Sequence, residues 1–282
     1  MTVAMSEWTE MIDDLTAYVR WRRETGARAE EFEPETAKAF LRSVSGVGCP
    51  VSGTRNPEPG APRPATRHPP VPDPELRMPH SAPGTPEARR TELANIAAKL
   101  AACTRCELCR QRKQVVPGQG NPLSPDVMFV GEAPGADEDA QGLAFVGAAG
   151  QLLTKMIAAM GYAREEVFIA NICKCRPPNN RPPAPDEMNA CLPYLREQIA
   201  VVRPKVLVAM GATAVKALLE SSRGISQLRG TWMTYAGIPL MPTFHPAYLL
   251  RLASAKHEAW SDLKKVLEKL GKPVPAKKAV GV

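Results

Sequence analysis

The sequence predicts an α/β fold in which a parallel sheet is covered by helices on both faces. From about residue 87 onward, short apolar runs alternate with longer segments of helical periodicity, and no internal repeat is visible. Such alternation is typical of parallel sheets whose connecting helices lie on both sides. Polar side chains also follow several of the apolar runs, which is where ligands bind in sheets of this kind.

The expected elements follow one another in strand–helix order. A first helix is expected at residues 87–102. The strands are the apolar runs VMFV, VFIANI, VLVAM and LMPTF, at residues 127–130, 167–172, 206–210 and 240–244. A helical segment follows each of them, at residues 150–160, 186–202, 213–220 and 256–270. Glu132, Asn171 and His245 therefore fall at the carboxyl ends of three strands, the expected ligand edge.

Composition divides the chain into four segments. Residues 1–45 are expected to be helical, because apolar residues recur at helical spacing from Ser6 to about residue 24. Residues 46–86 are expected to be a disordered linker, since residues 50–86 alone hold twelve of the 29 prolines. The folded domain is expected at residues 87–272 and a disordered tail at 273–282. The N-terminal helix could bind a protein partner, and we expect the chain to be a monomer.

The net charge and the distribution of apolar residues indicate what kind of partner the protein binds and in which compartment it is found. The formal net charge of +7 and the pI of about 9.1 favour a nucleic-acid partner, although a solvated basic surface would give the same values. No run of 18 apolar residues predicts a membrane span, and the acidic N-terminus lacks an apolar signal core. We therefore expect a cytoplasmic protein, in which the seven cysteines indicate metal or redox chemistry.

Four cysteines are arranged as candidate metal ligands. Cys103 and Cys106 form a CxxC pair, and Cys175 and Cys191 lie far downstream. By number alone, four thiolates suit zinc and an iron–sulfur cluster equally well. Two further cysteines, Cys109 and Cys173, lie close to these ligands in sequence, so spacing does not decide the ligand set.

A glycine-rich loop with carboxylates follows the first strand. It reads GEAPGADEDAQGLAFVGAAG over residues 131–150 and runs into a helix. Its glycines allow close approach of a ligand, while Glu132 and Glu138 suggest water activation or charge stabilisation. For Asp137 and Asp139 a solvated surface position is expected.

Several of these segments together resemble the family 4 uracil-DNA glycosylases, the iron–sulfur branch of that superfamily. The resemblance rests on GEAPG with Glu138, on the GxxFVGxAGxxL run, on NICKCRPPNNRPP and on FHPAYLL, and it covers roughly residues 96–270. It implies a three-layer fold with a central four-stranded parallel sheet. It also implies a [4Fe–4S] cluster on Cys103, Cys106, Cys175 and Cys191. Ala144 departs from the family, which has proline there, and this can loosen the loop that carries Phe145.

The resemblance and the chemistry of the residues together assign roles in base recognition. A target base must be flipped out of the duplex. Phe145 would stack on it, and Asn171 would read the edge that distinguishes uracil from cytosine. Gly131 and Ala133 complete the expected substrate-binding set, Ala133 standing where family 1 enzymes have aspartate.

The expected reaction is hydrolysis of the N-glycosidic bond of uracil in single- or double-stranded DNA, the first step of base excision repair. His245 would stabilise the departing uracil anion, and Glu132, or as second choice Glu138, would orient water and favour the sugar cation. The stretch Tyr248–Arg251 resembles a wedge that enters the DNA. The alternatives are a non-catalytic iron–sulfur DNA-binding protein of the same fold and a zinc-stabilised nucleic-acid-binding protein.

Overall fold

The computed structural model describes residues 84–221 and 223–275. The N-terminal helical segment and almost all of the Pro-rich linker expected from the sequence lie outside these residues, as does most of the expected tail. Within the described part, regular elements run from Pro86 to Lys269. None of the helices described there is of a length and apolarity that would let it cross a membrane.

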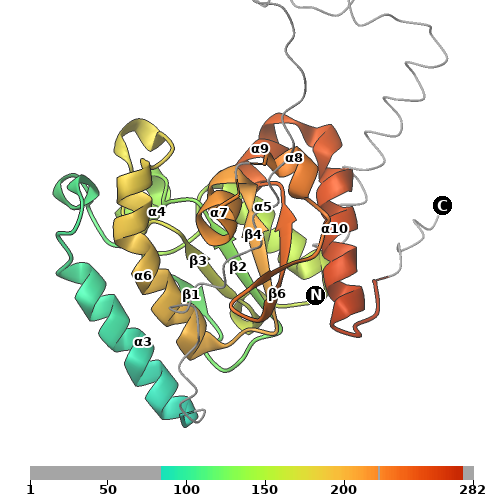
Figure 1. Cartoon of the computed structure of the whole chain (residues 1–282), viewed down its shortest axis with the longest axis horizontal. Helices are drawn as coiled ribbons and strands as arrows, with labels where there is room; N and C mark the ends of the chain where they lie inside the picture. Colours follow the sequence, from blue (N-terminus) through green and yellow to red (C-terminus); the bar gives the residue numbers. More distant parts are fainter. Residues whose placement is uncertain (1–83, 222, 276–282) are drawn as a thin grey trace, which may run out of the picture. The chain divides into compact units, whose positions relative to one another are not determined.

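A six-stranded sheet forms the middle layer (Figure 1). Its strand order is β1-β3-β2-β4-β6-β5, and the four inner strands are parallel. These inner strands are β2 (Val127–Gly131), β3 (Phe168–Asn171), β4 (Val206–Met210) and β6 (Ile238–Thr243). They confirm the four expected strands, with ends that differ by at most two residues. Every residue of β2, β3 and β4 is buried, as expected for strands covered on both faces.

Two short antiparallel strands extend the sheet at its edges. They are β1 (Gln119–Gly120), which pairs with β3, and β5 (Met233–Tyr235), which pairs with β6. No sequence pattern predicts these two strands, because two or three residues are too few to show a periodic pattern.

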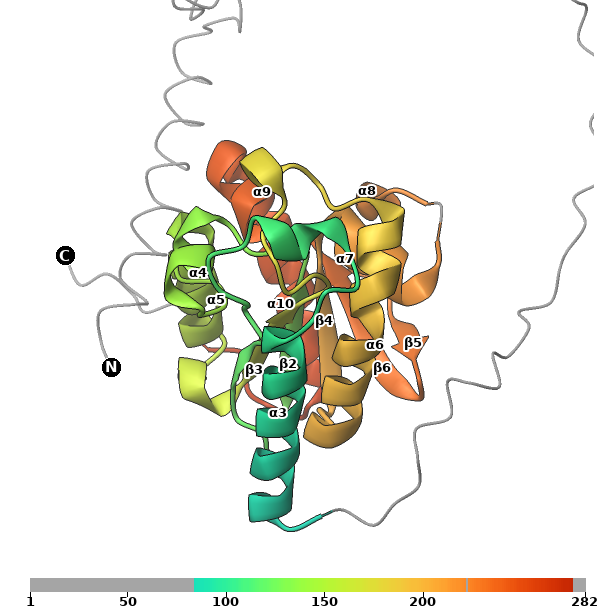
Figure 2. The same cartoon turned by 90° about the vertical axis from the view of Figure 1, so that its left-hand side faces the viewer.

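Helices cover both faces of the sheet, which confirms the expected three layers (Figure 2). On one face lie α6 (Pro185–Val202) and α7 (Gly211–Leu219), and α3 (Pro86–Ala101) packs outside α6. On the other face lie α5 (Ala148–Ala159) and α10 (Lys256–Lys269). These five helices match the expected ones within two residues. Three short helices were not predicted: α4 (Ala136–Gln141), α8 (Ile225–Leu228) and α9 (Pro246–Arg251).

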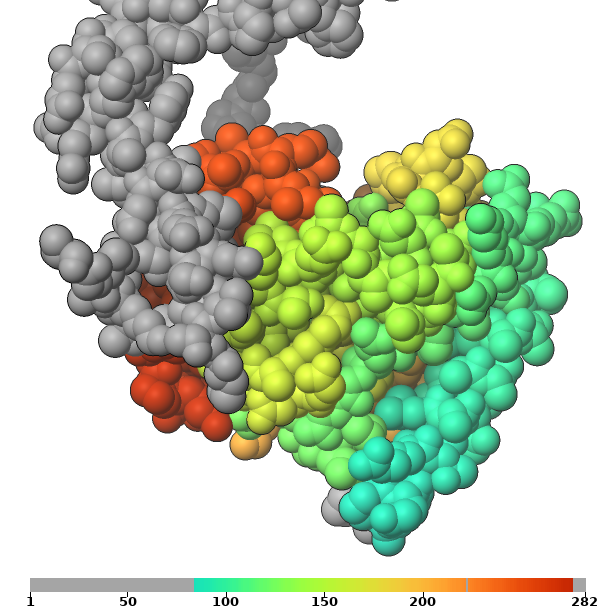
Figure 3. All heavy atoms as spheres, turned by 180° about the vertical axis from the view of Figure 1, so that it is seen from behind, coloured from blue at the N-terminus to red at the C-terminus, as the bar shows by residue number. Residues whose placement is uncertain are grey.

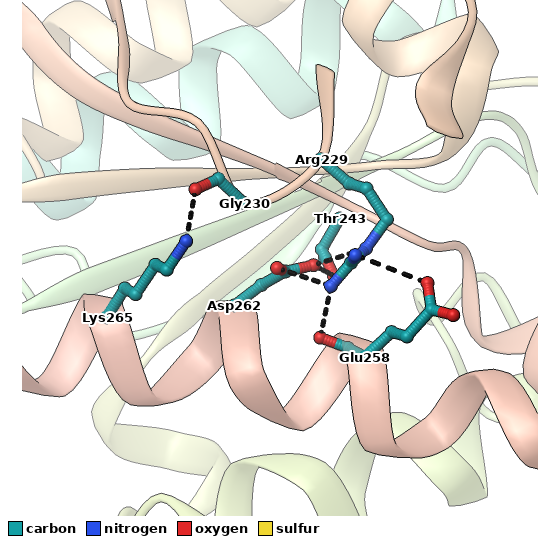
Figure 4. Close-up of polar contacts among 6 residues, drawn as sticks. All are labelled: Arg229, Gly230, Thr243, Glu258, Asp262 and Lys265. Carbon is teal, nitrogen blue, oxygen red and sulfur yellow. Dashed lines mark hydrogen bonds and ion pairs between the residues drawn. The ribbon is translucent and has the colours of Figure 1, made fainter. Parts of the chain in front are cut away.

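A buried polar network fixes the end of β6 on α10 (Figure 4). Asp262 of α10 is 1% exposed and accepts hydrogen bonds from the Thr243 hydroxyl at 2.8 Å and from Arg229 at 2.7 and 3.1 Å. Arg229 also donates to the main-chain oxygen of Glu258, and Lys265 donates to that of Gly230. Since Thr243 lies two residues before His245, this network holds the start of the segment that enters the functional site.

Candidate active site

A cavity of about 330 Å³ lies at the carboxyl ends of β2, β3 and β6. In the space-filling view the orange and yellow segments stand apart from each other above the yellow-green segment, and a gap separates them (Figure 3). The cavity brings together six of the residues that the sequence predicts for the site, namely Glu132, Ala133, Glu138, Phe145, Asn171 and His245. These residues come from three separate segments, namely the loop after β2, the end of β3 and the residues after β6, so the fold assembles the cavity.

Gly131 lies directly behind the cavity. A Cβ atom at this position would stand 2.5 Å from Asn171 Oδ1 and 2.5 Å from the Phe145 ring. No side chain fits in that space. The glycine therefore lets the ring and the amide approach the end of β2 closely.

Phe145 is held in a strained main-chain conformation. Its φ angle is +53° and its side chain is only 6% exposed. A non-glycine residue in this region costs about 1–3 kcal/mol and persists only where its surroundings enforce it. Arg164 enforces it by donating to the main-chain oxygens of Ala144 at 2.5 Å and Phe145 at 2.9 Å. The loop is thus tied down although Ala144 replaces the family's proline.

Glu138 stabilises the same loop from its other side. Its carboxylate accepts hydrogen bonds from the main-chain N–H groups of Gly135 at 3.0 Å, Val146 at 2.8 Å and Gly147 at 2.9 Å. The residue is 8% exposed. Both carboxylate oxygens are therefore engaged with the loop that presents Phe145.

Glu132 has a different environment. Its side chain lines the cavity and is partly exposed. One carboxylate oxygen accepts a hydrogen bond from the hydroxyl of Thr213, in the first turn of α7. The other carboxylate oxygen has no recorded hydrogen bond in the described part of the chain. Thr213 had no signal in the sequence that connected it with the site.

Two buried polar atoms at the cavity lack a partner within the described structure. They are Asn171 Oδ1 and His245 Nε2. Asn171 is 2% exposed and stands at the end of β3. Leaving a buried polar atom unpaired costs about 1–3 kcal/mol, so such atoms point to a ligand that pairs with them.

The hydrogen bonds of His245 define its protonation state. Its Nδ1 accepts from the main-chain N–H of Ala247 at 3.2 Å, at the start of α9. Burial, together with the positive charge of Arg251, lowers the pKa of His245 to about 4. The ring is therefore neutral at pH 7, and with Nδ1 as acceptor the proton sits on Nε2, which becomes a donor.

The neighbouring aspartates behave differently from each other. Asp137 is exposed, as expected. The prediction of a solvated position for Asp139 was wrong, because Asp139 is 2% exposed. Its carboxylate accepts from the main-chain N–H of Lys113 at 2.9 Å, which binds α4 to the segment before β1. The sequence does not reveal this role, because an acidic residue that binds a buried main-chain N–H looks the same in an acidic run as one that faces solvent.

The stretch Tyr248–Arg251, which is expected to form a wedge, lies in helix α9, and Leu252 follows it directly. Leu249 is buried, and Tyr248 packs on Phe244 with ring centroids 4.9 Å apart. Leu250 and Leu252, in contrast, are 48% and 43% exposed. Two large apolar side chains therefore project into solvent from the element that begins at the cavity.

The turn that follows β3 contributes further residues to the lining of the cavity. Pro177, Asn180 and Arg181 border the cavity, within the motif CRPPNNRPP, although no role was predicted for them. Arg181 donates to both carboxylate oxygens of Glu187, at 2.6 and 2.8 Å. This pair fastens the turn to the first turn of α6.

Five cysteines line a second, small cavity. They are Cys103, Cys106, Cys109, Cys175 and Cys191, together with Arg112 and Lys174. Cys173 is fully buried and interacts with Cys191. The hydrogen bond with Cys173 lowers the pKa of Cys191 below its ordinary value, and the charge of Lys174 contributes to this. Within residues 84–221 and 223–275, no three histidine, cysteine or acidic side chains are grouped tightly enough to hold a single metal ion.

Comparison with known proteins extends this picture. The family model of the uracil DNA glycosylase superfamily matches residues 117–264. The type-4 uracil-DNA glycosylase of Thermotoga maritima is 46% identical over 167 residues, 57% of this chain and 85% of the relative. That of Archaeoglobus fulgidus is 39% identical over 191 residues, 65% of this chain and 96% of the relative. A type-5 uracil-DNA glycosylase of Pyrobaculum aerophilum is 31% identical over 183 residues, 54% of this chain and 80% of the relative. The chain therefore belongs to the uracil DNA glycosylase superfamily and, within it, to the type-4 family.

Proposed function

We propose that this protein excises uracil from DNA and leaves an abasic site, the first step of base excision repair. The observation that carries the proposal is the pair of unpartnered buried atoms, Asn171 Oδ1 and His245 Nε2, in one cavity with the ring of Phe145. A flipped uracil supplies a partner for each of them. Its N3–H group can donate to Asn171 Oδ1, and its O2 atom can accept from His245 Nε2–H.

Hydrolysis breaks the bond between uracil N1 and C1′ of the sugar, while a water oxygen forms a new bond to C1′ and loses a proton, and the departing uracil anion finally takes up one proton. The uracil leaves as an anion whose charge spreads onto its oxygens. A neutral imidazole donating to O2 stabilises that anion and remains available at pH 7 because the pKa of His245 is about 4. Phe145 holds the ring of the base by stacking, which contributes about 1–3 kcal/mol.

Glu132 is the carboxylate that we assign to the sugar and the water. It lines the cavity and keeps one oxygen without a recorded partner in the described structure, while Thr213 orients the other. A negative charge there would favour the developing sugar cation and accept a hydrogen bond from water. Glu138 is a positioning residue in this proposal, because its oxygens are engaged by three main-chain N–H groups.

DNA is the expected partner of the surface around the cavity. The net charge of +7 favours a polyanion. Leu250 and Leu252 are suited to fill the space that a flipped base leaves, since exposed apolar side chains of this kind enter base stacks.

The cysteine cavity is the candidate site of the [4Fe–4S] cluster implied by the resemblance to family 4. The donor set fits: five thiols line one cavity, and Arg112 donates to Cys175 Sγ at 3.2 Å while the main-chain N–H of Lys174 faces Cys191 Sγ at 3.3 Å. Each thiolate of a [4Fe–4S] cluster binds a different iron, so its ligands stand further apart than those of one zinc ion. Cys103, Cys106, Cys175 and Cys191 would hold the cluster and cross-link α6, the segment after β3 and the segment after α3.

The proposal is tested with an oligonucleotide that contains one uracil. The full-length protein is incubated with it, and alkali then cleaves the strand at any abasic site. We expect strand cleavage with uracil and none with an otherwise identical oligonucleotide that has cytosine in its place. Tight binding of the uracil oligonucleotide without cleavage would instead support the non-catalytic alternative.

A further inference from the structure

We propose that Lys174 is a positioning residue whose buried ammonium group ties the main chain of Asn171 to the wall of the cysteine cavity and so fixes the amide that reads the base. Lys174 is 0% exposed. It follows β3 by three residues and lines the cysteine cavity, whereas Asn171 lines the cavity for the base. Lys174 thus lines the cysteine cavity and also contacts a residue of the base cavity.

The side chain of Lys174 folds back onto the end of its own strand. Its Nζ atom donates to the main-chain oxygen of Asn171 at 2.8 Å and to Gln198 Oε1 at 2.6 Å. Gln198 in turn donates to the main-chain oxygen of Pro117 at 2.6 Å. The turn from Asn171 to Lys174 is therefore closed by a side chain and anchored to α6.

The main chain of Lys174 is held as firmly. Its N–H group faces Cys191 Sγ at 3.3 Å, and its carbonyl oxygen accepts from the N–H of Val116 at 2.8 Å. A displacement of Cys191 would consequently act on Lys174, and through its ammonium group on Asn171.

The charge of Lys174 links it to the sulfur atoms. Both oxygens that accept from its ammonium group are neutral amide oxygens. A thiolate at Cys191, whose Sγ atom faces the main-chain N–H of Lys174 at 3.3 Å, would place a negative charge beside it. A buried cation needs such compensation, because removing an uncompensated charge from water costs several kcal/mol. Cysteine thiolates that held a cluster would supply that compensation, so a filled cysteine site would favour the position of Lys174 that holds Asn171.

The inference rests on the proposed function and makes it depend on the cysteine site. A displaced Asn171 amide would lose hydrogen bonds to the base, and a misplacement of about 1 Å can lower a rate up to a hundredfold. A lysine that merely fills space in the core would affect stability without changing which base is excised.

The test compares Lys174→Met with the native holoprotein. Methionine keeps the unbranched shape but removes the ammonium group. The matched control is Lys205→Met, which removes the charge of a lysine that is 66% exposed and pairs with Asp126. The measurements are single-turnover excision from the uracil oligonucleotide, inhibition by free uracil, the ratio of uracil to cytosine excision, and iron release to a chelator.

For Lys174→Met we expect at least a tenfold loss in excision rate and in affinity for free uracil, a lower uracil-to-cytosine ratio and faster iron release. Affinity for undamaged DNA and all properties of Lys205→Met should stay within about twofold of native. Native selectivity and uracil affinity in Lys174→Met would overturn the inference, whereas inactivity of the native protein would instead remove the proposed function.

A second variant covers the case in which Lys174→Met does not fold. Gln198→Leu leaves the ammonium group and removes only one of its two acceptors. We expect a three- to tenfold loss of uracil affinity and a lower uracil-to-cytosine ratio. Unchanged uracil affinity and selectivity in Gln198→Leu would contradict the positioning role.

Discussion

The ring centroids of Phe145 and His245 lie 5.6 Å apart, and their planes are inclined by 36°. The first ring is held by a strained main chain and the second by the start of α9. A base stacked on Phe145 therefore has one edge within reach of His245, which makes stacking and anion stabilisation parts of one geometry.

Replacing Phe145 by leucine should weaken binding of the base. Loss of stacking is expected to lower kcat/KM about tenfold to a hundredfold, corresponding to about 1–3 kcal/mol. Affinity for DNA without uracil should remain unchanged. The control is Phe168→Leu, since Phe168 is 4% exposed on β3 and does not line the cavity. It should lower stability and leave kcat/KM near native. Equal losses of activity in both variants would argue against stacking.

The two glutamates of the loop should respond differently to the same change. Glu132→Gln removes the charge beside the sugar and should reduce kcat on the order of a hundredfold with little effect on thermal stability. Glu138→Gln places an NH2 group against main-chain N–H donors and should lower the free energy of unfolding by about 1–3 kcal/mol. Steady-state kinetics and thermal denaturation of both variants give the comparison. A larger loss of kcat in a stable Glu138→Gln protein would exchange the two roles.

The inner strands were predictable because burial on both faces gives a short continuous apolar run, and the long helices because burial of one face imposes a periodic apolar pattern. The convergence of Glu132, Asn171 and His245 followed from the rule for parallel sheets. Contacts between distant segments were not predictable. Three hydrogen bonds depend on side-chain directions that only the folded chain sets. They join Arg164 to the main-chain oxygen of Phe145, Thr213 to Glu132, and Lys174 to the main-chain oxygen of Asn171. Asp139 was misjudged for the same reason.

The pKa of His245 predicts a pH dependence of stability. Its ordinary value is 6.5 and its value in the folded protein is about 4. Between these values the unfolded chain binds a proton and the folded protein does not, so stability rises with pH. The free energy of unfolding that depends on a neutral His245 is fully present above pH 6.5. It falls by up to about 3 kcal/mol in total as the pH falls to 4.

The measurement is the thermal midpoint of the native protein and of His245→Gln between pH 7 and pH 5. Other carboxylates titrate in both proteins, so the difference between the two isolates His245. We expect the native midpoint to fall more steeply with acid than that of the variant. Parallel curves would mean that the imidazole is not held neutral by its surroundings.

The cysteine ligands can be separated by iron content. Serine at Cys103, Cys106, Cys175 or Cys191 should lower bound iron and thermal stability, because each change removes one of four thiolates. Serine at Cys109 or Cys173 should leave most of the iron in place, although both lie beside the ligands. Iron that persists in Cys175→Ser but disappears in Cys173→Ser would reassign the third ligand.

Asn171 should set the choice of base, because its Oδ1 atom is buried and without a partner in the described structure. Uracil offers a donor at N3 and an acceptor at O4, whereas cytosine offers an acceptor and a donor there. An amide held in one orientation pairs with uracil and meets cytosine with two like groups. Each unpaired buried group costs about 1–3 kcal/mol, so two give a preference on the order of a hundredfold or more.

Asn171→Asp should therefore lose uracil excision steeply. The aspartate has no NH2 donor for O4, and when ionised it repels the uracil anion as it forms. When protonated it could donate to N3 of cytosine, so a weak cytosine activity is expected at low pH. Asn171→Ala should lose selectivity and most of the rate but still bind DNA. Excision by both variants is measured on paired uracil and cytosine oligonucleotides, with Asn189→Asp, which lies in α6 away from the cavity, as the control. Native uracil excision by Asn171→Asp would remove Asn171 from base reading and leave Phe145 and His245 to select the base.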